Sequence, residues 1–460
     1  MASVVLSRAI KSRTTSSLVN HALQASASVQ VTAAQVDGNV AWDNARPFEK
    51  IPGPKPLPLI GNLHRFIPGI GELSTKDQLH MQKHLLEKYG KIVKITGIPG
   101  RRDMVMVYDP KWFEEMFRNE SMWPHREFLQ SLDYYRNVYR KDFFEGVGGV
   151  LVEQGERWKK FRSTVNPPMM QPRVALRYLK PITEVTNDLI KRTKSLRNSV
   201  GEMPDDFINE LFKWALESIA VIALDHRLGC LDPNLKADSE PQKMIDAVSD
   251  FFAGLEVMEL RPPLWKIMST PTWRRFARAM DYFTDVSMKH INNAIERMNN
   301  RKPGEDYEPS VLEKLLQRDP NPKTACVMAI DMLIAGVDTT NVIMPHLSLS
   351  NTEEYNPLPS QFIPERWLKS RPGTDGSVGS AEDYDKVKDF KMNPFTYLPF
   401  GFGPRMCVGK RFAELEFAVL ITKMVRHFHI DYNYGDMMFS SVLLHKPADP
   451  LKFKLTDRVY

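Results

Sequence analysis

The chain has 460 residues, of which 42% are hydrophobic and 26% charged, and its formal net charge is +6. This composition is that of an ordinary globular protein, and the length suits one large helical domain. So small a charge excess gives no reason to expect a nucleic-acid partner. The three cysteines, Cys230, Cys326 and Cys407, are far apart. Their odd number and their spacing predict no disulfide framework, which favours a reducing compartment.

The first 36 residues contain no aspartate or glutamate, and they carry Arg8, Lys11 and Arg13 among serines and small apolar residues. That composition is typical of a mitochondrial transit peptide, and the alternative is a disordered basic tail. Residues 37–58 form a linker that ends in a stiff, proline-rich hinge. Residues 59–460 are then expected to form one domain. The chain contains no run of about 18 apolar residues, so we expect no transmembrane span.

The pattern predicts a small β-containing N-terminal lobe followed by helices. An amphipathic helix is expected over 78–89, and a β-hairpin over 91–96 and 104–108. A later helix is expected to start at Phe207, with Asp205 or Asp206 as its cap and Gly229 at its end. Up to residue 340 the pattern stays helical.

Two helical segments carry candidate ligand-binding or catalytic residues. Trp158 and Arg162 are four residues apart and therefore share a helix face; the plain alternative is a surface cation–aromatic pair. A strongly apolar helix over 327–340 ends in Ala-Gly-Val-Asp338-Thr339-Thr. Small residues leave room there for a ligand, and a hydroxyl can open the helix by bonding to its backbone. The alternative is an ordinary helix C-terminus.

The stretch from Phe400 to Gly409 is a glycine-rich loop that delivers Cys407 to the start of a helix expected over 410–427. On that helix Ala413, Phe417, Leu420 and Met424 are expected to form the apolar stripe. First-turn N–H groups and the helix dipole are expected to favour the thiolate of Cys407, which is the form that binds metals. Phe400 would lie beneath a flat ligand, and Arg405 would neutralise a carboxylate on its edge. The alternative is a buried free cysteine.

Four residues frame this cysteine in the order F-x-x-G-x-R-x-C-x-G: Phe400, Gly403, Arg405 and Gly409. The stretch resembles the haem-binding loop of the cytochrome P450 family. The resemblance implies a mainly α cytochrome P450 fold with a small β-containing N-terminal lobe. It also implies that the cofactor is haem b, with Cys407 as the axial thiolate on the iron.

The same resemblance implies roles for the other singled-out residues. Trp158, Arg162 and Arg405 would hold the haem, and the first two match a W-x-x-x-R pair that contacts a propionate. Thr339 would orient water and protons at the reacting centre, and Asp338 would feed that proton relay.

The activity implied is that of a monooxygenase acting on a lipophilic small molecule, steroid-like or foreign. Electrons would come from an adrenodoxin-type ferredoxin and its NADPH reductase. The transit-like N-terminus and the hinge resemble the mitochondrial, arthropod-like members, which implies the matrix side of the inner membrane. The apolar region 251–273 corresponds to the family's channel cover, which leaves room for peripheral membrane contact.

The chain departs from the family pattern after Thr340. Residues 341–351 are strand-like and resemble the family's segment just before Pro364-Glu365-Arg366-Trp367. The family places an E-x-x-R helix between these landmarks, and here only Glu115–Arg118 fits that pattern, too early in the chain. We therefore expect that an internal block is lost at the 340/341 junction, so that the fold is incomplete after residue 340.

The loss has physical consequences. It is expected to deprive Arg366 of its charge partners and to leave strand edges open. One alternative to the enzyme is thus an inactive, truncated isoform that is unfolded or binds haem poorly. Another is a small-molecule binding protein without redox chemistry, which requires Cys407 to be incidental.

Overall fold

The structure is a computed structural model that describes residues 45–459 except 68, 70, 74–77, 127, 128, 262, 303–306, 339–348, 374–377 and 442–444. The chain divides into two units, Met1–Ile51 and Pro52–Tyr460. In the first unit the described residues form a single 3₁₀ turn, η1 (Phe48–Lys50). The predicted transit segment 1–36 lies outside the described residues.

The N-terminal lobe agrees with its prediction. It contains the turn η2 (Leu63–Phe66), helix α3 (Gln78–Tyr89) and an antiparallel hairpin of β1 (Ile92–Ile95) with β2 (Met104–Val107). Ile92 is paired with Val107 and Ile95 with Met104. Successive side chains of β1 point to opposite faces, so Val93 and Ile95 lie on the same face. Both enter a small buried cluster with Leu85 of α3.

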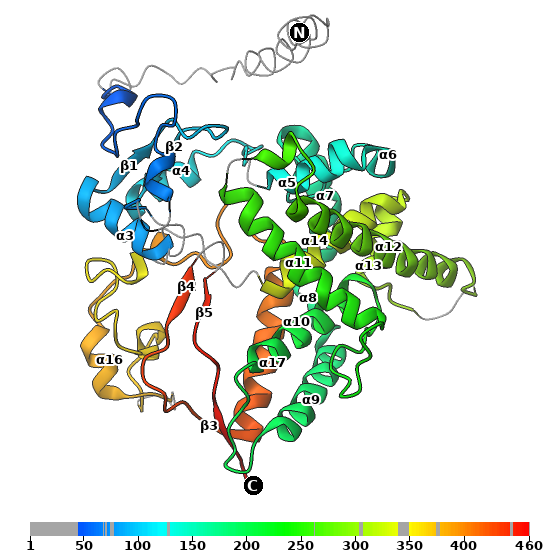
Figure 1. Cartoon of the computed structure of the whole chain (residues 1–460). Coiled ribbons are helices and arrows are strands. Elements are labelled where there is room, and N and C mark those ends of the chain that lie inside the picture. Colours follow the sequence, from blue (N-terminus) through cyan, green and yellow to red (C-terminus); the bar gives the residue numbers. More distant parts are fainter. Residues whose placement is uncertain are drawn as a thin grey trace, which may run out of the picture. The chain divides into compact units, whose positions relative to one another are not determined.

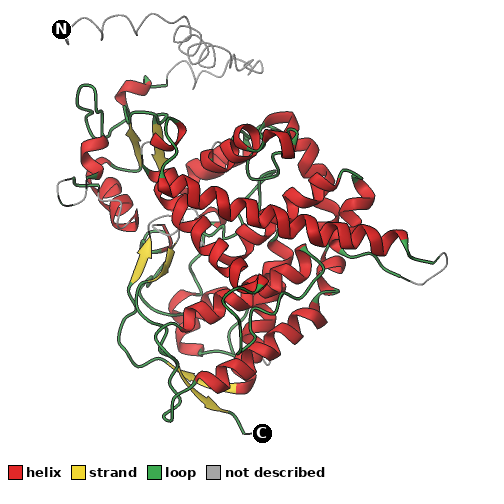
Figure 2. Cartoon of the chain, turned by 45° about the vertical axis from the view of Figure 1, so that its right-hand side comes forward, coloured by secondary structure: helices red, strands yellow, loops and turns green. Residues whose placement is uncertain are grey.

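The rest of the second unit is mainly helical, as predicted, and its strands lie in separate pairs (Figure 2). Up to residue 338 the elements are α4 (Pro110–Arg118), α5 (Gln130–Tyr134), the π-helical turn η3 (Tyr135–Tyr139), α6 (Lys141–Phe144), α7 (Gly155–Met170), α8 (Pro172–Leu176), α9 (Leu179–Leu196), α10 (Phe207–Ala223), α11 (Glu240–Leu260), η4 (Leu264–Lys266), α12 (Pro271–Asn299), α13 (Val311–Arg318) and α14 (Pro322–Asp338) (Figure 1). After residue 348 they are η5 (Pro364–Trp367), α16 (Ala381–Val387), η6 (Pro394–Thr396), α17 (Lys410–His427), β3 (Phe428–Asp431), β4 (Phe439–Ser441), β5 (His445–Pro447) and β6 (Lys454–Asp457).

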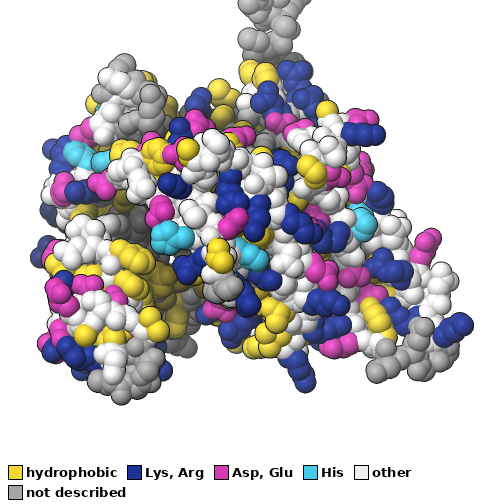
Figure 3. Space-filling view, turned by 90° about the horizontal axis from the view of Figure 1, so that it is seen from below, with side chains coloured by type: hydrophobic (Ala, Val, Ile, Leu, Met, Phe, Trp, Pro, Cys, Tyr) yellow, Lys and Arg dark blue, Asp and Glu magenta, His cyan; other side chains and the backbone are white. Residues whose placement is uncertain are grey.

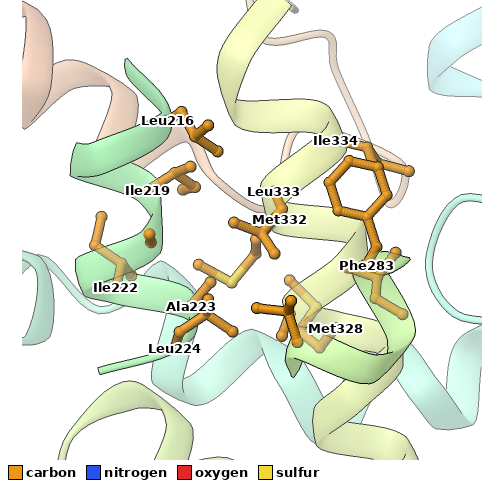
Figure 4. Close-up of a cluster of buried hydrophobic side chains, with 14 of the residues drawn as sticks. Leu216, Ile219, Ile222, Ala223, Leu224, Phe283, Met328, Met332, Leu333 and Ile334 are labelled. Atoms are coloured by element: carbon orange, nitrogen blue, oxygen red, sulfur yellow. The ribbon is translucent and has the colours of Figure 1, made fainter. Parts of the chain in front are cut away.

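The main core forms around α14, which packs against α10 and α12. Figure 4 shows Ile219 of α10, Met332 of α14 and Phe283 of α12 among the buried side chains that meet there. At Gly336 a Cβ atom would lie 2.7 Å from the Ile219 side chain, so glycine allows α14 to approach α10 closely. The apolar part of the predicted 327–340 helix therefore belongs to the centre of the domain.

Two details of the α10 prediction need correction. Asp206 is the N-cap residue, but its side chain makes no capping hydrogen bond, and Asp205 instead forms an ion pair with Lys452 at 2.8 Å. The helix ends at Ala223 rather than near Gly229. The chain turns at Asp225, which has a φ of 54°. Gly229 lies in the next loop and donates its N–H to buried Glu217 at 2.8 Å.

Helix α17 has the predicted bounds, but the prediction of its packed face is wrong in part. The buried residues are Phe412, Glu416 and Val419, whereas Phe417 is exposed. The helix is apolar on more than one side, so periodicity alone could not select the face that meets α9.

The C-terminal strands were not predicted. β3 pairs with β6, and β4 with β5, both antiparallel. Phe428 and Leu455 of the first pair enter a small core with Phe207, which ties the chain's end to the start of α10. Among the described residues no helix combines the length and the apolar character that crossing a membrane requires.

The buried carboxyl of Glu416 in α17 gives a prediction for stability against pH. Burial without a hydrogen-bond partner for Oε1 raises its pKa from 4.5 to about 8. Between these values the folded chain keeps a proton that the unfolded chain has lost, so the free energy of unfolding should fall as pH rises through this window. We expect Glu416→Gln to flatten that pH dependence in urea unfolding measured from about pH 5 to about pH 8. Glu414→Gln, an exposed neighbour, is the matched control. Parallel profiles for the Glu416→Gln variant and the unmodified chain would contradict the prediction.

Candidate active site

The Cys407 loop connects η6 to α17 and folds back on itself. Gly401 and Gly403 have φ values of 69° and 73°, which favour glycine, and a Cβ atom on Gly403 would lie 3.3 Å from a Glu120 carboxylate oxygen. The N–H of Cys407 donates to the carbonyl of Phe400 at 2.8 Å. The loop therefore closes across these residues and holds the cysteine two residues before the N-cap of α17.

Cys407 is exposed, whereas Cys230 and Cys326 are buried. Its thiol still has many protein atoms around it, and this desolvation raises the pKa of the thiol. The N–H groups of Gly409 and Lys410 and the charge of Arg162 act in the opposite direction without outweighing it. The N–H groups at the helix start thus favour the thiolate, as predicted, but burial of the thiol, which was not predicted, makes the net shift of its pKa upward. A coordinated metal ion would supply the remaining stabilisation, because it deprotonates the thiol that binds it.

Helix α7 brings Trp158 and Arg162 beside this loop. Both side chains are buried, and Arg162 Nη2 donates to the carbonyl of Met406 at 2.7 Å. Their burial rules out the alternative of a surface pair. Trp158 Nε1 and Arg162 Nε are buried without a hydrogen-bond partner within the described structure. Two unused donors next to the cysteine loop thus remain for an acceptor.

Arg405 lies over the Trp158 ring, with its guanidinium carbon 4.2 Å from the ring centroid. Its N–H groups donate to backbone carbonyls, at 3.1 Å to Pro124 and 2.9 Å to Glu153, and to the Gln154 side chain at 2.8 Å. None of these acceptors is a carboxylate. The predicted role of Arg405, to neutralise a carboxylate on the edge of a ligand, therefore stays a prediction.

The surroundings of Arg405 are rich in positive charge. Burial and the neighbouring charges of Arg126 and Arg162 lower the pKa of Arg405 to about 10. Arg126 is paired with Glu120 at 2.6 Å, and no ion pair of Arg162 or Arg405 is present in the described part of the chain. Surplus positive charge and unused donors beside the cysteine fit the edge of a ligand that carries carboxylates, as haem does. Arg126 and Glu120 belong to no motif, and no sequence pattern indicated them.

The remaining predicted residues are only partly visible. Phe400 is half-buried, and its ring centre lies 5.5 Å from Lys410 Nζ. Asp338 is the last residue of α14. The Asp338 side chain and the whole of Thr339 lie outside the described residues, so the predicted relay is not observed.

Arg366 of η5 has only neutral partners within the described structure. It donates to the side chain of Asn356, to the carbonyl of Pro357 at 3.0 Å and to that of Ile363 at 3.0 Å. The neighbouring Glu365 accepts the N–H of Ser380 at 2.8 Å through Oε1, and its buried Oε2 has no partner. Oxygen atoms of nearby loops thus solvate the Arg366 charge.

A mainly helical domain with an exposed cysteine fits the haem-thiolate class of proteins, and so do the neighbouring Arg162 and Arg405, which form no ion pair within the described residues. The chain belongs to the cytochrome P450 family, because the family model described as "Cytochrome P450" matches residues 51–342 and 340–454. Its cofactor is therefore haem iron with thiolate ligation.

Similar proteins of known sequence carry the name of the same family. "Probable cytochrome P450 301a1, mitochondrial" of Drosophila melanogaster is 33% identical, with 93% of this chain and 90% of the relative covered. "Probable cytochrome P450 12a5, mitochondrial" of the same species is 34% identical, with 93% and 94% covered. "Cytochrome P450 CYP12A2" of Musca domestica is 33% identical, with 93% of each covered. These alignments extend over 513, 517 and 519 positions, more than the 460 residues of this chain.

A solved structure shows the same fold. The crystal structure of the cytochrome P450DA heme domain superposes with a TM-score of 0.60 at 15% identity, and covers 89% of this chain and 97% of that domain. The predicted cytochrome P450 fold is confirmed.

Proposed function

We propose that Cys407 is the axial ligand of the haem iron and that the chain is a monooxygenase acting on a lipophilic small molecule. The observation that carries the proposal is that Arg162 and Arg405, beside this exposed cysteine, have no carboxylate partner among the described residues. Bound haem would use two electrons and two protons to insert one atom of O₂ into a C–H bond and release the other as water.

The chain's own residues divide this work. Trp158, Arg162 and Arg405 would bind the haem carboxylates, the first two through their unused donors. Gly403 permits the turn of the loop, and Phe400 would pack beneath the haem plane. Asp338 and Thr339 are proposed for proton delivery. The substrate is a steroid-like molecule or a foreign lipophile.

The electron donor is proposed to be an adrenodoxin-type ferredoxin with its NADPH reductase. Basic side chains occupy both helices that hold the cysteine loop: Arg157, Lys159 and Lys160 on α7, and Lys410 and Arg411 on α17. Basic side chains near the cysteine loop would favour an acidic protein partner.

We propose a mitochondrial location, on the matrix side of the inner membrane. The transit-like composition of residues 1–36 and the mitochondrial names of the relatives support it. Peripheral contact with that membrane is part of the proposal.

A second candidate is a truncated family member without turnover. The family model matches in two segments that meet at residues 340–342, and Arg366 has no carboxylate partner among the described residues. Both observations support the loss of a block at the 340/341 junction.

The absorption spectrum of purified residues 37–460, reduced and exposed to carbon monoxide, tests the proposal. Stoichiometric haem with a strongly red-shifted Soret band is expected if Cys407 binds iron as the thiolate. A band typical of a neutral ligand, or no haem, would favour the truncated protein without turnover.

A further inference from the structure

Two histidine rings stack on each other where the turn after α10 and the start of α11 meet α12. His226 belongs to that turn and is exposed, whereas His290 of α12 is only 5% exposed. Their ring centroids are 4.5 Å apart, with 29° between the ring planes. His290 Nε2 lies 3.2 Å from a carboxylate oxygen of Glu240, the first residue of α11. These three side chains therefore join three segments in one cluster.

Glu240 attaches the first turn of α11 to α12. Its other carboxylate oxygen accepts from Lys289 Nζ, and its backbone carbonyl accepts from the hydroxyl of Tyr282 at 3.1 Å. The buried apolar side chains of α11 begin only at Met244, so the residues before it depend on these polar contacts. A helix end that is held by few apolar contacts opens at a lower free energy than the core does.

The charges around the stacked rings balance while both histidines are neutral. The charged neighbours form ion pairs, which are Glu240–Lys289, Asp225–Arg297, Arg227–Glu217 and Arg227–Asp188. Tyr282 stays neutral as well, because burial raises its pKa to about 12. The surface is also basic on balance: Lys and Arg side chains predominate over acidic ones on the face seen from below (Figure 3), in line with the net charge of +6.

Acid adds positive charge to this cluster without adding a partner for it. Protonation of both rings would place two like charges side by side and next to Lys289, with the Glu240 carboxylate shared among all three. Burial lowers the pKa of His290, although its hydrogen bond to Glu240 acts in the opposite direction. The stability that neutral His290 contributes is therefore present above the ordinary histidine pKa of about 6.5 and is lost as the pH falls through the lowered pKa.

We propose that His226, His290 and Glu240 form a pH-sensitive tether. With both histidines neutral, the tether fixes the first turn of α11 to α12 and to the turn after α10. As the histidines become protonated, this first turn and the exposed loop 232–239 before it separate from α12, while the rest of the domain stays folded. The tether is independent of haem and of the proposed oxygenation, so its test needs only the polypeptide.

Amide hydrogen exchange of the full chain tests the tether at about pH 7.5 and about pH 5.5, on either side of the histidine range. The rates are converted into protection factors, which removes the intrinsic effect of pH on exchange. At the lower pH we expect protection of residues 243–247 to fall about fivefold or more, and that of residues 185–190 in α9 to persist. Buried Glu416 stabilises the whole domain in acid, so it cannot cause this local loss. An equal loss in both segments, or a gain in residues 243–247, would overturn the proposal.

Two variants identify the titrating groups. His226→Phe keeps a ring for stacking and His290→Gln keeps a donor for Glu240, but neither new side chain titrates. Each variant should weaken the pH dependence of protection in residues 243–247, and the double variant should abolish it. The matched control is His429→Gln, which removes an exposed, ion-paired histidine of β3 and should retain the full dependence. Because His226 is exposed, His226→Phe gives this reading even where replacing His290 impairs folding. An undiminished pH dependence in His226→Phe would also overturn the proposal.

Discussion

Replacing Cys407 with serine should abolish the red-shifted carbon monoxide band completely and sharply reduce haem content. Serine has nearly the same size, but its oxygen does not replace a thiolate on haem iron. The two other cysteines cannot substitute, because both are buried and desolvation raises the pKa of their thiols, that of Cys326 to about 12.

The comparison variant is Cys230→Ala, which should retain the spectrum of the unmodified chain. Thiol labelling of the haem-free protein provides a reading that is independent of haem. One cysteine should react rapidly in the unmodified chain and in Cys230→Ala, and none should react rapidly in Cys407→Ser. Persistence of the red-shifted band in Cys407→Ser would show that another group ligates the iron.

Removing the carboxylate of Asp331 should destabilise the domain by about 3–5 kcal/mol, because it leaves the Arg136 charge buried and unpaired. Arg136 Nη2 and Asp331 Oδ1 are 2.7 Å apart, and both side chains are almost completely buried. Asp331 also accepts the N–H of Val150 at 3.1 Å, and Arg136 donates to the carbonyl of Gly148 at 2.6 Å. Urea unfolding of Asp331→Ala measures the loss.

Two control variants test whether the loss of stability comes from leaving a buried charge unpaired. The double variant Arg136→Met with Asp331→Leu should recover much of the lost stability, because no charge stays buried. Asp385→Ala, which breaks the exposed pair with Arg371, should leave the unfolding midpoint nearly unchanged. If Asp331→Ala and the unmodified chain have the same free energy of unfolding, the Arg136–Asp331 pair does not stabilise the domain as predicted.

The buried pair of Arg136 and Asp331 is also connected to the candidate active site. Asp331 accepts a hydrogen bond from the N–H of Val150, and the carbonyl of Val150 accepts one from Arg405 at 3.3 Å. One turn of chain therefore connects the central helix α14 to the arginine that lies over Trp158. We expect loss of the pair to loosen Arg405 as well as the core.

Local patterns predicted the local structure well. The bounds of α17 and α3 and the β1–β2 hairpin agree with the sequence analysis. In each case the signal was a period, a turn residue or a motif that acts over a few residues. The family resemblance supplied the rest of the site.

Features that depend on distant parts of the chain were missed. Arg136 and Asp331 are 195 residues apart, and no pattern indicates that they meet. The sign of the Cys407 pKa shift depends on how many atoms surround the sulfur, which the sequence does not reveal. The exposed side of α17 could not be distinguished from its packed side, because both are apolar.

The hydrogen bond between Arg162 and Met406 spans 244 residues and has a consequence for the order in which the protein is made. During synthesis the helices up to α14 leave the ribosome well before the cysteine loop exists. They can pack early, because domains form from the N-terminal end as the chain emerges. The cysteine and its arginine neighbours meet only when nearly the whole chain has been translated, so cofactor uptake must be among the last events of biosynthesis.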